Sequence, residues 1–370
     1  MKSFELKYFN TKLYFGLNVI KNLPKHLNGI ERVTIVTGKR SARLSGALKD
    51  VERILKDLDI EYDVFDKIKP NPTVEIANEL SEFLWRSSSD CLIAIGGGSV
   101  IDTAKFSSCV ALSGGDAKDY LRGKNAKRTL PLFAVNLTHG TGSEIDRFAV
   151  LTDGREKIGV SIRYPDVSFD DPRYTLTLPR DQSIYTCVDA FFHAYEAVTA
   201  KTTNPFVETL SFECAKIIGE NLKEKLKLEE RSKLLYASVI AGISLDLSPA
   251  HIVHAIEHAL SGINPKLAHG CGLALIGARS IYWIHRYSKN SSKILSLLTR
   301  REVKSAEDAE RSFREFLNSV GFEDRLEDYI GKDDFREVED IVFGTLSYLL
   351  KRVDFEFTRE MLYDILEKSL

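Results

Sequence analysis

The spacing of hydrophobic residues changes about halfway along the chain. In the first half, short apolar runs rich in β-branched residues alternate with stretches of helical periodicity. This pattern predicts strands at 32–37, 62–65 and 91–95, with helices between them at 45–58 and 74–86. Strands that alternate with helices indicate a parallel sheet with helices on both faces.

From about Pro179 onward the hydrophobic spacing is helical. Long stretches with a period near 3.6 and few β-branched runs cover residues 181–199, 205–226, 229–245 and 250–260. We therefore predict two domains, a Rossmann-like α/β domain of residues 1–178 and an all-helical domain of residues 179–370. The opening segment around Tyr14 is expected to add one or two strands to the sheet.

Composition narrows the class of partner. The chain has 370 residues, with 51 Lys and Arg against 53 Asp and Glu, so its formal charge is −2. A balance of this kind gives no basic field for a nucleic acid and no polybasic face for a membrane, which leaves small molecules as the expected partners. The five cysteines form no CxxC pair, and the N-terminus lacks an apolar signal segment. We therefore expect a cytoplasmic protein with free thiols.

Two glycine-containing turns are candidates for phosphate binding. Gly96, Gly97, Gly98 and Ser99 follow the predicted strand 91–95 and precede a helix. Backbone N–H groups at such a helix start, helped by the helix dipole, suit the diphosphate of a dinucleotide. A tight strand-to-helix turn without a ligand would explain the same residues. The second turn, 138–144, places small hydroxyl residues between glycines.

Metal-binding chemistry is concentrated in the helical half. Asp189 and His193 stand at i and i+4, so both project from one face of a helix. An exposed ion pair would have the same spacing, but the apolar residues between the two favour burial. Four of the eight histidines lie within a short later stretch, namely His251, His254, His258 and His269. A carboxylate with imidazoles suits Fe(II), Zn(II), Co(II) or Ni(II) better than Mg²⁺ or Ca²⁺.

Several motifs together carry a resemblance to a known family. GGGSVIDTAK, THGTGSE, DAFFHAYEA and the segment from VHAIEHAL to AHG follow one another in this order, and YFG and Asn71-Pro72-Thr73 precede them. Over nearly its whole length the chain resembles the iron-containing, or metal-dependent group III, alcohol dehydrogenases. The resemblance implies a dinucleotide-binding domain and a helical domain, a plan shared with dehydroquinate synthases, and an active site in the cleft between them.

The resemblance also assigns residues. It implies that the metal ligands are Asp189, His193, His254 and His269. His258 falls on a family histidine that lines the site without binding metal, and His251 is expected outside the ligand set. The family's cofactor contacts fall on Asn71, Gly97, Gly98, Ser99, Asp102, Thr138, Thr141 and Lys157.

Four departures from the family pattern bear on the cofactor, the substrate or the metal. Gly38 occupies the position where NAD-preferring members resemble one another in having an aspartate, and Lys39, Arg40 and Ser41 follow it. Without that carboxylate to repel a 2′-phosphate, NADP(H) is expected to be preferred over NAD(H). The turn that in relatives often begins Pro-Thr-Thr-Ala here ends in His139, and Asp146 replaces a threonine that typically approaches the nicotinamide side. The spacing from His254 to His269 is about one residue longer than usual.

The expected reaction is hydride transfer between an alcohol and NADP(H), with the reverse reduction of an aldehyde. The catalytic residues are expected to be Asp189, as a ligand of the Lewis-acid metal, and His258, as a proton relay or else a polar wall. Having His193 favours Fe(II), with Zn(II) as the alternative. Phe148 and Phe192 are expected to line the pocket for a small substrate.

Other functions remain open at this point. A zinc-dependent, glycerol-type polyol dehydrogenase is the alternative within the same reaction class, although such enzymes typically lack a histidine at the position of His193. The carbon–oxygen lyase chemistry of dehydroquinate synthases and a non-catalytic nucleotide- or metal-binding protein are more remote. Relatives commonly dimerise through the first β-strands, so a homodimer is expected.

Overall fold

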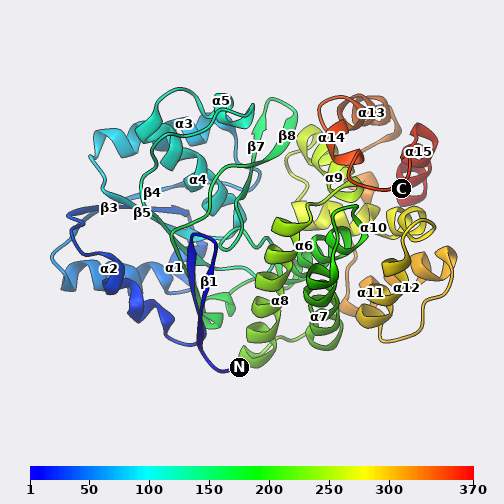
Figure 1. The fold of residues 1–370 in the computed structure, drawn as a ribbon, viewed down its shortest axis with the longest axis horizontal. Coiled ribbons are helices and arrows are strands. Elements are labelled where there is room, and N and C mark those ends of the chain that lie inside the picture. Colours follow the sequence, from blue (N-terminus) through cyan, green and yellow to red (C-terminus); the bar gives the residue numbers. More distant parts are fainter.

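The first half of the chain is built around one twisted sheet. The structure, a computed structural model, describes residues 1–370, and seven strands pair in the order β1-β2-β9-β6-β5-β3-β4 (Figure 1). β1 runs antiparallel to β2, and every other pairing in this sheet is parallel. The strands are β1 (Phe4–Tyr8), β2 (Thr11–Phe15), β3 (Arg32–Gly38), β4 (Glu61–Ile68), β5 (Cys91–Gly96), β6 (Leu132–Asn136) and β9 (Val167–Asp170).

Helices cover both faces of this sheet, as the alternating pattern predicted. The strand β5 is apolar throughout because helices cover both of its faces. Ile93 packs with α2, whereas Leu92 packs on the opposite face with α3 and α4. A parallel strand buried on both faces cannot show polar alternation. The helical segments of this half are η1 (Val19–His26), α1 (Ser41–Leu44), α2 (Ala47–Asp57), α3 (Val74–Arg86), α4 (Gly98–Ser113), α5 (Ala117–Leu121) and η2 (Pro172–Thr175).

Two local elements were not predicted. The helix expected at 45–58 is present as α2, but the short helix α1 precedes it, and Gly46, with φ 82°, separates the two. The sequence interpretation also missed a β-hairpin, made of β7 (Phe148–Asp153) and β8 (Glu156–Ser161). This hairpin lies outside the main sheet, where β7 packs on α4 of the first half and β8 packs on α9 of the helical half (Figure 1). Contact there is close, since a Cβ on Gly262 would lie 2.2 Å from the carbonyl oxygen of Arg155.

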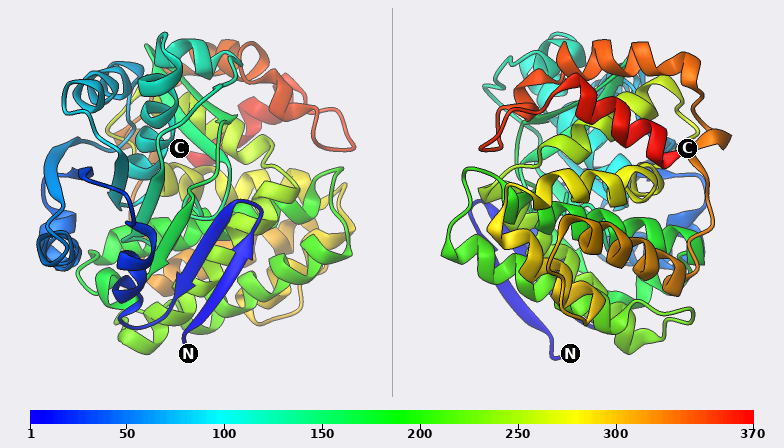
Figure 2. Two further views of the ribbon diagram at one scale, coloured as in Figure 1. Left: turned by 60° about the vertical axis from the view of Figure 1, so that its left-hand side comes forward. Right: turned by 90° about the vertical axis from the view of Figure 1, so that its right-hand side faces the viewer.

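The second half is all-helical, as predicted, and packs beside the sheet domain (Figures 1 and 2). The predicted boundary between residues 178 and 179 falls between η2 and α6. The helices are α6 (Arg180–Thr199), α7 (Pro205–Asn221), α8 (Leu228–Leu247), α9 (Ile252–Ile263), α10 (His269–His285), α11 (Lys289–Thr299), α12 (Ala306–Val320), η3 (Leu326–Asp328), η4 (Lys332–Asp334), α13 (Phe335–Phe343), α14 (Ser347–Leu350) and α15 (Arg359–Ser369). By length and hydropathy no helix could cross a membrane by itself, and the one joint candidate, α8 with α9, is bent by 103°.

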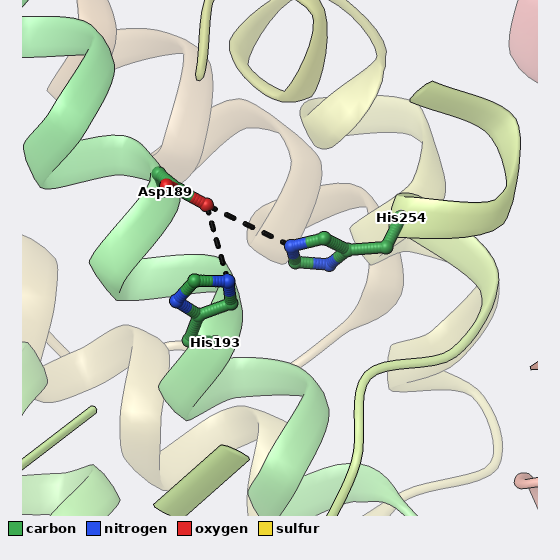
Figure 3. A group of neighbouring side chains, drawn as sticks. All are labelled: Asp189, His193 and His254. Atoms are coloured by element: carbon green, nitrogen blue, oxygen red, sulfur yellow. Dashed lines mark ion pairs between the residues drawn. The ribbon is translucent and has the colours of Figure 1, made fainter. Parts of the chain in front are cut away.

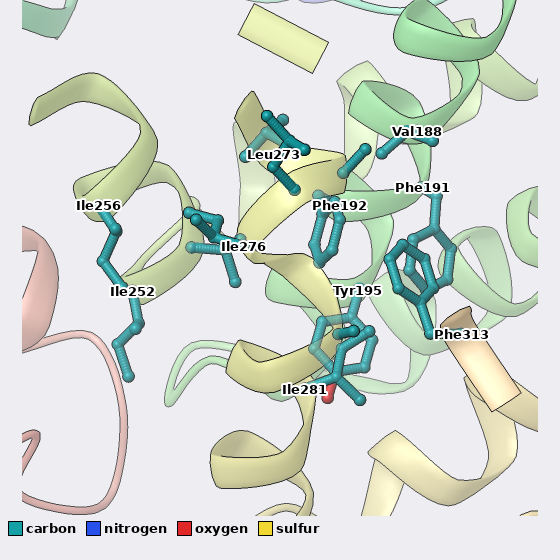
Figure 4. Packing of buried hydrophobic residues seen from close by; sticks show 14 of the residues in the cluster. Val188, Phe191, Phe192, Tyr195, Ile252, Ile256, Leu273, Ile276, Ile281 and Phe313 are labelled. Carbon is teal, nitrogen blue, oxygen red and sulfur yellow. The ribbon is translucent and has the colours of Figure 1, made fainter. Parts of the chain in front are cut away.

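Aromatic side chains of α6 fill the centre of the helical domain. Phe191 and Phe192 both pack on Phe313, with ring centroids 5.5 and 5.4 Å apart (Figure 4). A Cβ on Gly277 would lie 2.4 Å from the Phe192 ring, so only glycine admits the ring at that place. The prediction that Phe192 lines the substrate pocket is therefore wrong, because both faces of α6 are buried and this ring points into the core. The five cysteines are buried and unpaired, as expected.

A pair of buried acids lies where the sheet meets the loop of residues 137–147. Asp170 ends β9, Glu144 belongs to that loop, and neither side chain is exposed to solvent. None of their four carboxylate oxygens has a hydrogen-bond partner, and the neighbouring amide nitrogen of Asn136 has none either. Burial raises the pKa of Glu144 to about 7, against a weaker opposing effect of Lys105. Burial, and then the charge of Glu144, raises the pKa of Asp170 well above its usual value.

Replacing Asp170 should therefore change how stability depends on pH. A pKa that is raised on folding stabilises the fold below the unfolded-state pKa, and this contribution is lost as pH rises through the folded-state value. The native protein should accordingly lose stability between about pH 5 and pH 8. Asp170→Asn removes one ionising group, and we expect it to raise the free energy of unfolding at pH 8 by roughly 1–3 kcal/mol.

Denaturant unfolding at pH 5, 6.5 and 8 measures this effect. Asp166→Asn is a suitable control, because Asp166 is partly exposed and hydrogen-bonded to Leu132 and Arg163. If Asp170→Asn lowered the free energy of unfolding equally at all three pH values, the raised pKa of Asp170 would not contribute to the pH dependence of stability.

Candidate metal centre and dinucleotide cleft

Four side chains from three helices converge on one point. Asp189 and His193 project from the same face of α6, His254 comes from α9, and His269 is the first residue of α10. The Oδ1 atom of Asp189 lies 3.3 Å from Nε2 of His193, 3.7 Å from Nε2 of His254 and 3.4 Å from Nε2 of His269. Figure 3 shows the first three of these groups pointing toward one another. The structure thus brings together all four ligands that the resemblance implied.

Two carboxylates that the sequence interpretation missed orient the imidazoles. Glu196 of α6 accepts a hydrogen bond from Nδ1 of His254, and Glu257 of α9 accepts one from Nδ1 of His269. Both carboxylates are fully buried. A proton held on Nδ1 leaves Nε2 with a free lone pair, which is how outer carboxylates prepare histidines for a metal. An acidic residue inside an apolar helical run, as in His254-Ala-Ile-Glu257, was the available signal.

The donor set fits a divalent transition metal. Asp189 Oδ1 and His254 Nε2 are buried and lack a hydrogen-bond partner within the protein. Ligand atoms of Asp189, His193 and His254 all lie within 4.8 Å of one another. Burial lowers the pKa of His193 to about 4, so its imidazole is neutral and able to donate a lone pair at pH 7. One carboxylate and three imidazoles match the preferences of iron or zinc.

Two other histidines, His258 and His251, lie near the ligand cluster. His258 lies beside the cluster, with its ring edge-on to His254 at 6.2 Å and tilted against His269 at 5.5 Å. Burial, followed by the charge of Lys157, holds the pKa of His258 well below its usual value. His251 instead bonds to Thr199 through Nε2 and lies 2.9 Å from Glu196 through Nδ1. Its place outside the ligand set agrees with the expectation.

The two glycine-containing turns face each other at the mouth of the cleft. A Cβ on Gly97 would lie 2.7 Å from the methyl group of Thr138, and one on Gly98 would lie 2.6 Å from that of Thr141. α4 begins at Gly98, so its first N–H groups lie at this contact. Glycine is required at these two positions because their backbone lies directly against the threonine side chains of the other turn.

Two hollows adjoin this contact, and we call them the inner cavity and the outer groove. The inner cavity contains the metal cluster, and the outer groove runs toward the end of β3. Six of the predicted cofactor residues line the inner cavity, namely Asn71, Gly98, Ser99, Asp102, Thr141 and Lys157. Three more line the outer groove, namely Ser41, Gly97 and Thr138. Gly38 and Lys39 line neither hollow, but they directly precede Arg40, which lines the outer groove.

Some of these residues have partners within the protein. Lys157 donates to Ser261 Oγ at 2.9 Å and to Glu257 at 3.2 Å, so it joins β8 to the outer carboxylate of His269. Asp102 accepts from Ser143 and from the backbone N–H of Val150. These contacts link the first domain to the walls of the inner cavity.

Asn71 crosses between the two domains. With φ 51° it adopts the left-handed conformation, and its side-chain amide donates to the carbonyls of Pro265 and Leu267 at 2.9 and 3.1 Å. Asn264 holds the same loop from the other side by donating to Tyr329. The longer spacing before His269 is therefore accommodated by a loop that is fastened at both ends.

The comparisons with known proteins agree with this arrangement. A family model described as iron-containing alcohol dehydrogenase matches residues 10–172, and one described as the C-terminal part of the Fe-containing alcohol dehydrogenase family matches residues 183–370. The chain belongs to the iron-containing alcohol dehydrogenase family. It is therefore an enzyme of the NAD(P)-dependent alcohol dehydrogenase class, and the family implies iron and a nicotinamide dinucleotide.

Relatives with full-length similarity include both curated sequences and solved structures. The chain is 34% identical to the long-chain primary alcohol dehydrogenase AdhA of Thermoanaerobacter ethanolicus, over 100% of this chain and 98% of that protein. A crystal structure of the NADH-dependent butanol dehydrogenase A of Thermotoga maritima is 27% identical and covers 98% of each chain, with a TM-score of 0.86. An archaeal Red Sea brine pool alcohol dehydrogenase shares the fold, at 23% identity over 100% and 99% of the chains, with a TM-score of 0.89.

The outer carboxylate of His269 gives a direct test of the metal centre. Glu257→Gln removes the charge that polarises this imidazole, and we expect metal affinity to fall roughly 10- to 100-fold. Titration of the metal-free protein with Co(II), followed by its visible spectrum and by competition with a chelator, measures the affinity. Glu229→Gln serves as the control, because the exposed carboxylate of Glu229 pairs with Lys233 and touches none of the histidines. Unchanged affinity in Glu257→Gln would mean that Glu257 does not act through His269.

Proposed function

We propose that this protein is an iron-dependent alcohol dehydrogenase and aldehyde reductase that transfers hydride between a primary alcohol and NADP(H) in the inner cavity. One observation carries the proposal. The metal cluster and the glycine turn line the same cavity, with Asp189, His193 and His269 on one wall and Gly98 and Ser99 on the other. A nicotinamide entering along the glycine turn would therefore meet an alcohol held at the cluster.

Each group in the cavity has a defined task under this proposal. When bound, the metal supplies Lewis acidity that lowers the pKa of an alcohol hydroxyl, and the nicotinamide accepts or donates the hydride. Asp189, His193, His254 and His269 hold the metal, while Glu196 and Glu257 fix the tautomers of two imidazoles. The first N–H groups of α4 bind the diphosphate. His258, whose ring lies beside those of His254 and His269, is the group proposed to pass the alcohol proton onward.

The choice of metal and substrate rests on the donor set and the cavity walls. His193 completes a four-ligand site, which supports Fe(II) over Zn(II) and disfavours a zinc polyol dehydrogenase. Phe148, Val150 and Leu245 are the apolar residues that line the inner cavity. Relatives that are about 30% identical are named for methanol and 1,3-propanediol, and the 34% identical relative for long-chain primary alcohols. These names support a primary alcohol as the substrate class.

We also propose a cytoplasmic homodimer. β1 is one of the two edge strands of the sheet, so its free edge can pair with a second copy of the chain. The five free thiols suit a reducing compartment.

Reduced-nicotinamide absorbance tests the proposed reaction. Protein loaded anaerobically with Fe(II), or separately with Zn(II), is mixed with NADP⁺ and a series of primary alcohols. We expect turnover that is highest with Fe(II), is abolished by a chelator and returns when the metal is added back. His193→Ala should lose most activity with either metal. Bound metal and cofactor without turnover on any alcohol or aldehyde would contradict the proposal.

Cofactor preference depends on the end of β3. Lys39 and Arg40 are exposed and follow Gly38 at the edge of the outer groove, where a 2′-phosphate could bind them. Gly38→Asp places a carboxylate there, and we expect the ratio of kcat/KM for NADP⁺ to that for NAD⁺ to fall roughly 10- to 100-fold. Steady-state kinetics with both cofactors measure the ratio.

Gly38→Ala is the matched control. A Cβ at this position lies 3.1 Å from the carbonyl oxygen of Ile68, so both variants require the same small adjustment, but only aspartate adds charge. A native ratio below one would overturn the proposed preference for NADP(H).

A further inference from the structure

A buried arginine without a negatively charged partner lies behind the outer groove. Arg231, near the N-terminus of α8, is 6% exposed. Its guanidinium donates to Ser183 Oγ at 3.2 Å, to the Leu178 carbonyl at 3.0 Å and to Nε2 of His139 at 3.3 Å. All three acceptors are neutral, and the Nε atom has no partner. Buried guanidinium groups are normally paired with a carboxylate, so this one leaves a positive charge uncompensated.

Nothing in the surroundings of Arg231 neutralises that charge. Burial, and then Arg231 itself, lowers the pKa of His139 to about 3, so His139 is neutral and accepts through Nε2. Its Nδ1 faces the hydroxyl of Thr186 at 3.1 Å and the thiol of Cys187 at 3.3 Å. Burial raises the pKa of Cys187, which keeps that thiol protonated. The helix dipole adds positive potential, because Arg231 lies at the N-terminal end of α8.

The guanidinium of Arg231 contacts the wall of the outer groove in two ways: directly through Leu178, and through His139, which is next to Thr138. Leu178, whose carbonyl it binds, lines the outer groove together with Thr138 and Gly97. His139 directly follows Thr138 in the turn that faces Gly97. Arg231 therefore supports that turn from behind, on the side of the helical domain. Its charge adds to the potential that the first N–H groups of α4 provide from the opposite wall.

We propose that Arg231, through its hydrogen bond to His139, is an electrostatic and positioning residue for the diphosphate of the dinucleotide. This inference rests on the proposed function, because it requires a dinucleotide in the outer groove. The bound diphosphate would provide the negative charge opposite Arg231 that none of its hydrogen-bond acceptors in the protein carries. His139, an unusual residue for the family pattern, would transmit the position of α8 to the turn at Thr138.

Calorimetric titration of the metal-loaded protein with NADP⁺, ADP-ribose and adenosine tests the proposal. Arg231→Met should weaken NADP⁺ and ADP-ribose binding on the order of tenfold, because a unit charge acts over several ångströms of protein. Adenosine, which has no phosphate, should bind as it does to the native protein. Arg231→Lys, which keeps the charge, should retain most of the affinity. Lys233→Met, on the surface of the same helix, is the control for loss of an exposed cation.

A second variant leaves Arg231 in place. Ser183→Asp puts a carboxylate beside the guanidinium, near the N-terminus of α6 where a negative charge is favourable. It should weaken NADP⁺ and ADP-ribose binding as Arg231→Met does, whereas Ser183→Ala should not.

The outcomes separate this inference from the proposed function. Native protein that binds neither NADP⁺ nor ADP-ribose would contradict the proposed function. Native binding of NADP⁺ with unchanged affinity in both Arg231→Met and Ser183→Asp would overturn the role of Arg231 alone. Equal weakening of adenosine and NADP⁺ would also overturn it, since that pattern indicates a general disturbance of the groove.

Discussion

The site depends on keeping several ionisable groups buried together. Asp189, Glu196 and Glu257 are all removed from solvent, and each is surrounded by imidazoles rather than by water. Burying a carboxylate is unfavourable unless hydrogen bonds or opposite charges compensate it. Glu196 and Glu257 obtain this compensation from Nδ1 of His254 and His269. Asp189 Oδ1 lies near three Nε2 atoms but has no hydrogen-bond partner, so a bound metal would supply its compensation, and metal binding and the stability of this region are linked.

Placing these groups requires three helices to be fixed with little freedom. α6 is held by its aromatic core around Phe191 and Phe192, and Glu196 further along the same helix accepts from the backbone N–H of Val253 at 2.7 Å. That bond sets the start of α9 and therefore His254. His269 depends on the loop that Asn71 holds from the other domain. One of the four proposed ligands is thus positioned by a contact across the cleft, so the relative placement of the two domains affects where His269 lies.

Much of the architecture could be read from hydrophobic spacing, because β3, β5 and α3 bury regular faces. The β7–β8 hairpin was missed even though its two-residue turn, Gly154-Arg155, has glycine at the first position, as many hairpins do. Its strands are only partly buried and lie outside the main sheet, so they lack the continuous apolar run of β5. The four proposed ligands came from a family resemblance, whereas Glu196 and Glu257 did not, because a single glutamate in a helix usually indicates a solvent-facing side. Only the fold shows that these helices have no such side.

Asp146 illustrates how an unusual residue can be accommodated beside a reactive centre. It lines the inner cavity, and burial raises its pKa to about 8. Lys105, fully buried on α4, donates to its Oδ1 at 3.0 Å and to the carbonyl of Phe148 at 2.6 Å. A threonine at this position would leave that ammonium without a carboxylate, so Asp146 and Lys105 are best understood as one unit. Because this unit also holds the first residue of β7, it fixes the strand whose partner, β8, carries Lys157 to Glu257 and hence to His269.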